Sequence, residues 1–407
     1  MLRCFFIFLL PLLPASLLSQ DAIRMAPFPK AVELGSPGLW GTLESYKVRL
    51  SCPPQYLSFI SIPSERTEWK FPFETAPQLE KYLSESGLTP DEIAYLLEEA
   101  QVFPAEESLR VFPSPEVIIG MPTALRAKFY RILARFPENT FHRRPAFLNT
   151  ANVSRYFYDS HFKVEMLRLI ATLSYPTPSG HGFFLSDIPY LMKQAMSSEE
   201  ERQLLNALLR VPALMVRLNL SDLTSAEELT DYWTAGFKNK QVRPLFESVM
   251  GNTHVDRLDV GHLLPPMARR SLNSFPEQSD GLDGRYPDWF WTCYNFFRFT
   301  PRNVYANSEE FDTLIQSEFM KSQDLYEFGD LLLLKSKGRT VHGCIYIADD
   351  IVYTKNGSGL FSPTILMKLQ DVVAYHDLEG DVILEHYRNT STKRSISHFP
   401  TGVAEVN

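Results

Sequence analysis

Hydrophobic and polar positions in the last third of the chain follow the alternation that is typical of β-strands. Four leucines occupy 331–334, a polar loop follows, and apolar and polar residues then alternate along 341–347. The acidic pair at 349–350 is a turn signal, and another apolar run begins directly after it. One apolar helical segment, 289–297, precedes these runs. We therefore expect a helix followed by an antiparallel sheet.

A longer region, 77–252, instead carries the period of amphipathic helices. Two capping boxes, each a Ser or Thr followed three residues later by Glu, predict helix starts at 89–92 and 198–201. An apolar stripe over 125–136 stops before a proline, which is a helix stop signal. Such stripes are typical of core-facing helices, so this region is predicted to be a helical domain.

Upstream of the helical region, residues 40–71 are rich in strand-forming side chains. Two short apolar runs flank Pro53 and Pro54, which predicts a strand, a turn and a second strand. Cys52, next to this turn, is expected to pack as a small hydrophobic side chain.

The N-terminus has the pattern of an export signal. Arg3 provides a positive charge, an apolar run covers 5–13, and small residues lead to a cleavage position near Ser19. Pro11 and Pro14 interrupt the segment, which is also shorter than the ~20 residues of a membrane-spanning helix. We expect an exported protein, periplasmic or extracellular. The alternative interpretation is a buried N-terminal helix.

Together the patterns predict an α+β protein, with a mostly helical N-terminal region, a small β segment and a C-terminal domain made of a helix and an antiparallel sheet. Residues 257–284 contain adjacent prolines and a polar, turn-rich stretch, which is typical of a linker. The predicted order is a signal peptide at 1–19, a β-rich segment at 20–75, a helical domain at 76–256, the linker at 257–284 and a final domain at 285–400.

The composition limits the classes of molecule that the protein is expected to bind. The net charge of −8 over 407 residues offers no basic surface for nucleic acid or for an anionic membrane. No second apolar run is long enough to span a bilayer, so no stable membrane span is expected after signal removal. Zinc-type spacings and Gly-rich phosphate loops do not occur, and we expect no metal and no cofactor.

The four cysteines are too few for a disulfide scaffold. Removal of the signal segment would take Cys4 and leave Cys52, Cys293 and Cys344, an odd number that leaves at least one free thiol. The sequence leaves open whether Cys293 and Cys344 form a disulfide.

Candidate chemistry centres on a thiol and an imidazole. Cys293 lies in a predicted helix that Asp288 would cap, and helix N-termini lower the pKa of a thiol. His342 opens a predicted strand 49 residues later (342 − 293) and suits a general base. The alternative interpretation makes Cys293 a core residue and His342 a satisfied or surface histidine.

These segments resemble the papain-like bacterial cell-wall peptidases of the NlpC family. The core of that family has a helix headed by Asp-Cys, a Gly-Asp pair that opens a strand, and a His-x-Gly-x-Tyr strand. The pair at 329–330 matches the strand opener, and 342–347 resembles the histidine strand with Cys344 at the usual Gly. After Asp288, however, the chain has Trp289, and the nearest Cys comes four residues later.

The resemblance implies a cysteine peptidase or amidase that acts on the peptide part of peptidoglycan. It also implies that Cys293 attacks an amide carbonyl and that His342 moves the proton. Thr354 then orients the imidazole from the next strand, with Asn356 as the alternative if the hairpin register shifts. His376 and His386 are further candidates for the same pocket, although no sequence spacing supports them.

Two other functions stay open on the sequence. Trp289, at the position where the family has its nucleophile, favours a catalytically degenerate papain-fold module that binds or supports envelope components. Thiol acyl transfer is the third possibility, because hydrolysis and transfer share an acyl-enzyme step.

Overall fold

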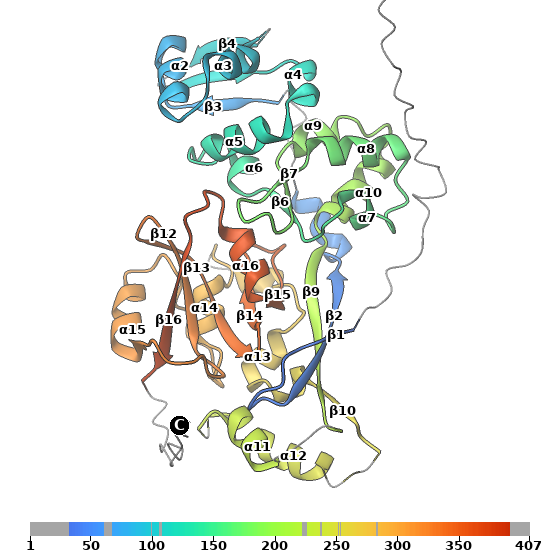
Figure 1. Ribbon diagram of the computed structural model, residues 1–407, viewed down its shortest axis with the longest axis vertical. Coiled ribbons are helices and arrows are strands. Elements are labelled where there is room, and N and C mark those ends of the chain that lie inside the picture. The colour runs from blue at the N-terminus through green and yellow to red at the C-terminus, as the bar shows by residue number, and fades with distance from the viewer. Residues whose placement is uncertain are drawn as a thin grey trace, which may run out of the picture.

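The computed structural model describes residues 32–390, apart from 61–66, 99, 106–107, 222–225, 237, 251, 253 and 282–283. The predicted signal peptide, 1–19, and the last ten residues of the predicted final domain, 391–400, lie outside these described residues. The described chain has a mixed α+β fold in which the strand ladders are antiparallel. Figure 1 shows an elongated arrangement, with a helical end, a central sheet and two helices at the opposite end.

The helical end holds two small three-stranded sheets, in the orders β3-β5-β4 and β6-β8-β7, surrounded by short helices. The strands are β3 (Trp69–Phe71), β4 (Gln101–Ala105), β5 (Ser108–Phe112), β6 (Ala146–Leu148), β7 (Tyr175–Pro176) and β8 (Phe183–Leu185). The helices are α2 (Ala76–Glu85), α3 (Pro90–Leu97), α4 (Pro115–Gly120), α5 (Thr123–Leu133), α6 (Thr140–Arg143), α7 (Val153–Tyr156), α8 (Val164–Leu173), α9 (Ile188–Met192) and α10 (Ser198–Leu208).

Local capping signals decide where these helices begin. Thr89 accepts a hydrogen bond from the Glu92 amide, and the Glu92 carboxylate accepts one from the Thr89 amide at 2.8 Å, which confirms the first predicted capping box. The second prediction was one residue late. Ser197 is the N-cap of α10 and accepts from the Glu200 amide, because the sequence Ser-Ser-Glu-Glu-Glu offers two adjacent frames.

The strand predicted after Pro54 is wrong. Residues Pro54–Phe59 form a short 3₁₀ helix, η1, instead. Pro54 occupies its first turn, where a proline loses no hydrogen bond and its fixed φ suits a helix start. Cys52 is buried beside Tyr56, as its apolar character predicts.

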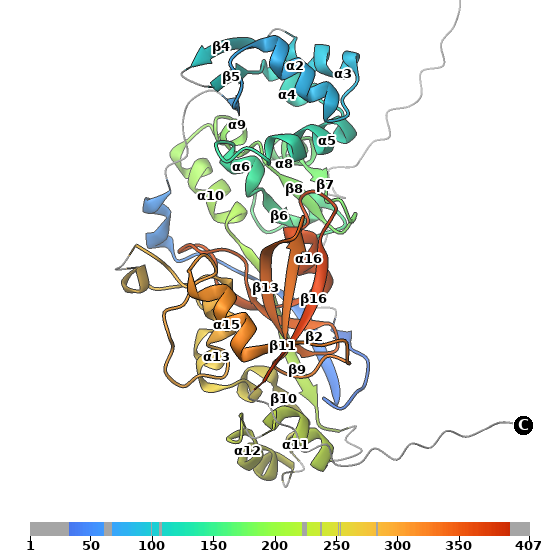
Figure 2. The same cartoon turned by 90° about the vertical axis from the view of Figure 1, so that its left-hand side faces the viewer.

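A long antiparallel pair connects the helical end to the rest of the molecule. Strand β2 (Thr42–Leu50) pairs with β9 (Val211–Asn219) along its whole length, and the sheet order is β1-β2-β9-β10. Figure 2 shows this sheet running beside the central one toward the opposite end. The remaining elements here are β1 (Glu33–Leu34), β10 (Arg257–Asp259), α11 (Ala226–Thr234) and α12 (Val242–Met250).

The C-terminal part is built on a six-stranded sheet in the order β11-β16-β12-β13-β14-β15. Its strands are β11 (Phe319–Lys321), β12 (Leu331–Ser336), β13 (Arg339–Ala348), β14 (Ile351–Lys355), β15 (Thr364–Lys368) and β16 (Ile383–Asn389). The helices are α13 (Pro266–Ser271), α14 (Trp289–Tyr294), α15 (Glu310–Glu318) and α16 (Leu369–His376). The predicted turn at 349–350 joins β13 to β14, with Asp349 at a φ of 54°.

The two faces of this sheet pack against different layers. Ile345, Ile347 and Tyr353 lie in one apolar cluster with α14, and this side is called the α14 face below. Cys344 and Val352 lie in another cluster with residues of α16 and β9, on the α16 face. Over 342–347, the alternation of side chains along a strand therefore assigns these β13 residues to one layer or the other.

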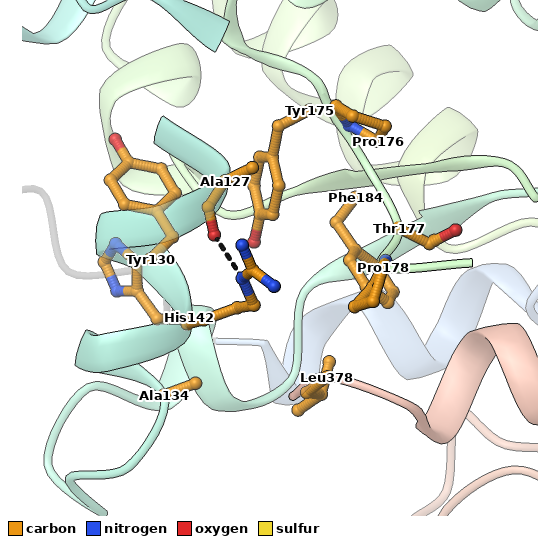
Figure 3. A pocket seen from close by; sticks show the side chains of 11 residues that line it. Ala127, Tyr130, Ala134, His142, Tyr175, Pro176, Thr177, Pro178, Phe184 and Leu378 are labelled. Carbon is orange, nitrogen blue, oxygen red and sulfur yellow. Dashed lines mark hydrogen bonds between the residues drawn. The ribbon is translucent and has the colours of Figure 1, made fainter. Parts of the chain in front are cut away.

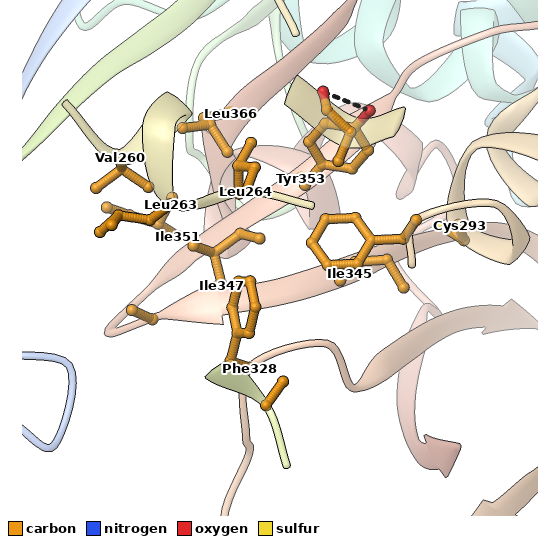
Figure 4. Packing of buried hydrophobic residues seen from close by; sticks show 14 of the residues in the cluster. Val260, Leu263, Leu264, Cys293, Phe328, Ile345, Ile347, Ile351, Tyr353 and Leu366 are labelled. Atoms are coloured by element: carbon orange, nitrogen blue, oxygen red, sulfur yellow. Dashed lines mark hydrogen bonds between the residues drawn. The ribbon is translucent and has the colours of Figure 1, made fainter. Parts of the chain in front are cut away.

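The segment expected to be a linker, 257–284, contributes to the core of the C-terminal part. Leu258, the 3₁₀ helix η2 (Val260–Leu263) and Ala268 belong to the same cluster as α14 and the sheet. Tyr353 donates a hydrogen bond to the Ala268 carbonyl, which Figure 4 draws as a dashed line. The second 3₁₀ helix of the segment is η3 (Gln278–Gly281). Its prolines and glycines shape turns without keeping its leucines out of the core.

Candidate functional site

Asp288 fixes the start of helix α14. One carboxylate oxygen accepts from the Trp291 amide at 2.8 Å and the other from the Ala306 amide at 2.7 Å. The cap that the sequence predicted is therefore present, but the helix ends at Tyr294 and is shorter than the predicted 289–297. Burial raises the pKa of the Asp288 carboxyl, and the backbone donors at the helix start oppose that rise.

Trp289 occupies the first position of α14 and lies against β13. A Cβ added at Gly343 would come within 2.6 Å of the indole carbon Cζ3, so the ring packs directly on the glycine backbone. The indole ring and the His342 imidazole have centroids 5.9 Å apart. The side chain after Asp288 is thus the part of α14 that approaches the histidine.

Cys293 lies one turn further along α14, in an apolar environment on the α14 face. Figure 4 shows it near Ile345, whose side chain points from β13 into the same cluster. The thiol is buried, and this burial raises its pKa well above the ordinary value, with smaller contributions from Cys344 and Asp288. Such a thiol stays protonated and is a poor nucleophile at neutral pH.

His342 lies on the opposite, α16 face of the sheet. Neighbouring residues of a strand alternate, so His342 shares the face of Cys344, while Gly343 and Ile345 face α14. The structure therefore does not bring Cys293 and His342 together. Cys344 shares the histidine's face but is fully buried in apolar packing, and burial raises its pKa. Cys52, Cys293 and Cys344 are all free thiols.

Thr354 is the residue that the structure does bring to His342. The imidazole Nε2 and the threonine Oγ1 are 2.8 Å apart, and both side chains are buried. The hydroxyl donates in turn to Asn356 Oδ1, at 3.2 Å. A hydroxyl that donates to Asn356 must accept from the imidazole, so Nε2 carries the proton and Nδ1 keeps its lone pair.

His376, from α16, completes this network. Its ring stacks on His342 with centroids 3.7 Å apart and planes 14° apart, and its Nε2 lies 3.2 Å from Asn356 Oδ1. Burial lowers the pKa of His376 to about 3. Burial also lowers the pKa of His342 well below its ordinary value, and the neighbouring His376 adds to the effect. Both imidazoles are therefore neutral at physiological pH.

The site pairs a buried imidazole with a hydroxyl that orients it. His342 Nδ1 is buried without a hydrogen-bond partner, and Thr354 fixes the tautomer in which this atom is basic. The α14 side chain with a ring contact to this histidine is Trp289, which has no group able to attack a carbonyl carbon. The geometry supplies no nucleophile from Cys293.

Asp330 and His386 have a structural role, because their contact connects two strands of the sheet. The Asp330 carboxylate accepts from His386 Nε2 at 2.6 Å and from the Arg388 guanidinium at 3.0 Å. It thereby ties the start of β12 to β16, and the Gly-Asp pair works as a strand opener. His386, an additional candidate for the histidine pocket, belongs to this cluster instead of the one around His342.

Sequence reasoning missed two polar contacts. His181 Nε2 lies 2.5 Å from Asp371 Oδ1 in α16, although 190 residues separate the two in sequence. Lys355 is buried on the α14 face, where its ammonium donates to the Gly359 and Ser362 carbonyls. Burial lowers the pKa of Lys355 to about 7, against the attraction of Asp288. A lone histidine between glycines and a lysine at a strand end carry no spacing signal that could have predicted these contacts.

Within the described ranges, no group of three His, Cys, Asp or Glu side chains is arranged to hold a metal ion. Over the same residues, no helix combines the length and the apolar character that crossing a bilayer requires.

Comparison with known proteins adds no relative. No protein-family model matches the chain, and neither the curated proteins nor the solved structures contain a match.

Proposed function

We propose that residues 285–390 form a papain-like module of NlpC type without a nucleophile, which has a binding or structural role in the cell envelope. The module would bind the peptide part of peptidoglycan or another envelope peptide, as the resemblance of its histidine strand implies. The single observation that carries the proposal is the position of Trp289 beside His342.

The proposal depends on comparing the groups that a thiol hydrolase needs with those that lie around His342 and Cys293. His342, Thr354 and Asn356 form a continuous hydrogen-bonded chain in which His342 Nδ1 has no hydrogen-bond partner. Cys293 would have to lose its proton inside an apolar core, on the other face of the sheet from that nitrogen. A thiolate there lacks the imidazole that would stabilise it, which favours the non-catalytic alternative over the hydrolase.

Peptidoglycan fragments provide the direct test. The mature protein should co-sediment with purified sacculi and leave disaccharide-peptide fragments uncleaved in the presence of a reductant. Cys293→Ala should behave as the wild type in both assays. Cleavage by the wild type that disappears in Cys293→Ala would contradict the proposal and favour the hydrolase.

A second test restores the missing group. Trp289→Cys would put a thiol at the position where the family has its nucleophile and remove the indole that lies beside His342, and iodoacetamide should label it faster than a free cysteine at neutral pH. His342→Gln in that background should slow the labelling, because no imidazole would then stabilise the thiolate. Trp291→Cys is the matched control on the same helix. Equal labelling rates at 289 and 291 would remove the argument that position 289 is the nucleophile position.

The envelope location rests on the sequence of 1–19 alone. Sequencing of the protein from its native host is expected to find an N-terminus near residue 20, after signal removal. An intact Met1 on a cytosolic protein would remove the envelope from the proposal.

A further inference from the structure

A pocket of about 180 Å³ lies in the helical end, away from the histidine network. Helix α5 forms one side, the segment from Tyr175 to Pro178 forms another, and Leu378 closes it from the loop after α16 (Figure 3). The occupant of this pocket would therefore contact both the helical end and the C-terminal part. The volume is comparable to the ~150 Å³ cavity that holds one benzene ring in an engineered protein.

Aromatic rings make up much of the pocket wall. Tyr130 and Tyr175 pack edge to face at 5.4 Å, and Tyr175 and Phe184 have centroids 5.9 Å apart. These rings are held by other contacts, since the Tyr130 hydroxyl donates to Asp187 and the Tyr175 hydroxyl lies 2.7 Å from Ser186 Oγ. These rings give the wall flat aromatic surfaces, which suit a flat ligand body.

One cation lines the pocket without an acidic partner. Arg131 Nε donates to the Ala127 carbonyl one turn earlier, the bond dashed in Figure 3, and within the described part of the chain its guanidinium pairs with no carboxylate. The arginines that precede and follow it along the chain are each paired with a carboxylate. Arg126 is fully buried against Asp187 at 2.7 Å, and Arg135 lies 3.7 Å from Glu379.

The electrostatic surroundings of Arg131 contain no competing free carboxylate among the lining residues. Asp187, behind the wall, is neutralised by Arg126 and by the Tyr130 hydroxyl. His142 also lines the pocket, with an Nε2 that has no partner, and burial lowers its pKa to about 3. A neutral imidazole and an unpaired guanidinium together favour an anionic group.

We propose that this pocket binds a small aromatic carboxylate, with the ring against Tyr175 and Phe184 and the carboxylate on the Arg131 guanidinium. A planar guanidinium matches the two oxygens of a carboxylate. The volume accommodates one ring and its carboxylate. The proposal is independent of the envelope role given above.

Benzoate is the probe, and the full mature chain is the protein. Isothermal titration or ligand-observed NMR should detect saturable binding of benzoate in the millimolar range or tighter. Benzyl alcohol, which has a similar shape and no charge, should bind roughly 10- to 100-fold more weakly, the difference expected for a charge-assisted pair of hydrogen bonds. Equal affinity for the two probes would overturn the proposal.

Variants locate the binding. Arg131→Gln should weaken benzoate binding by a similar factor and leave the affinity for benzyl alcohol unchanged. Arg135→Gln is the matched control on the next turn and should keep the wild-type affinity. Ala134→Leu should fill the pocket and abolish binding of both probes while Arg131 is intact, with circular dichroism to check the fold. Full benzoate affinity in Arg131→Gln would contradict the assignment.

The source of the carboxylate is tested by competition. A tripeptide that ends in Phe also carries a phenyl ring and a carboxylate, but two carbons separate the ring from the carboxylate carbon. It should compete with benzoate poorly, because its ring and carboxylate are spaced differently from those of benzoate. A tripeptide that binds more tightly than benzoate would overturn the small-molecule assignment.

Discussion

The two faces of the central sheet hold the two halves of the chemistry that the sequence suggested, and they differ in kind. The α14 face is an apolar core in which Cys293 packs beside Ile345. The α16 face carries a hydrogen-bonded polar network around His342 and Thr354. A thiol is stable without partners in the first environment, whereas each polar atom of the second depends on its neighbours. A match to the family's order of residues along the chain therefore does not place the cysteine and the histidine on the same face of the sheet.

The largest expected effect concerns the reactivity of Cys293 and Cys344. Both thiols should resist iodoacetamide under native, reducing conditions, because exposure requires unfolding that costs ~5–15 kcal/mol in an ordinary domain. Labelling should thus be slowed by several orders of magnitude and become complete in denaturant, as mass spectrometry can follow. Rapid native labelling of Cys293 that His342→Ala suppresses would break the comparison of the two faces.

Truncation on the α14 face should cost the most stability. Ile345→Ala removes a side chain that is 2% exposed and leaves a cavity, which should lower the free energy of unfolding by roughly 2–5 kcal/mol in urea denaturation. Val341→Ala, on the same strand but 38% exposed, is the control and should cost much less. Similar losses at 341 and 345 would show that this face is not closed.

Removal of the Thr354 hydroxyl tests how much the polar network on the α16 face contributes to stability. Thr354→Val keeps the shape of the side chain but leaves His342 Nε2 and Asn356 without their shared partner. The unfolding free energy should fall by roughly 1–3 kcal/mol, the cost of buried unsatisfied polar groups. The matched change Thr340→Val, nearer the exposed start of β13, should be close to neutral. A neutral Thr354→Val would mean that the network contributes little to stability.

The smallest effect is a dependence of stability on pH. The pKa of His376 is about 3 when folded and ~6.5 when unfolded, so below pH 6.5 the unfolded state binds more protons and stability falls as pH falls. The loss should be about 1 kcal/mol for this group between about pH 6.5 and 5.5. His342, with a lowered pKa of its own, acts in the same direction.

Substitution isolates that contribution. His376→Phe keeps a ring against His342 and should make the unfolding free energy less steep with pH by about the amount above. His262→Gln, which changes an exposed histidine, should leave the slope unchanged. An unaltered slope in His376→Phe would indicate that the stacked pair is open to water.

The sequence by itself determined the local structure where a short-range rule applies. The capping box at Thr89, the Asp288 cap, the acidic turn after β13 and the alternation along β13 are all set by residues within a few positions of each other. The pairing of Thr354 with His342 was expected only from the family resemblance, which implies a polar orienting residue on the strand after the histidine.

Only the tertiary structure decided how these pieces meet. Alternation groups the residues of β13 into two sets, but it does not say against which set helix α14 packs, and this choice separates Cys293 from His342. The composition of 257–284 is that of a linker, but the segment packs in the core. Its few leucines contact residues that are far away in the chain. The contact of His181 with Asp371 depends on the same long-range packing, which no local pattern encodes.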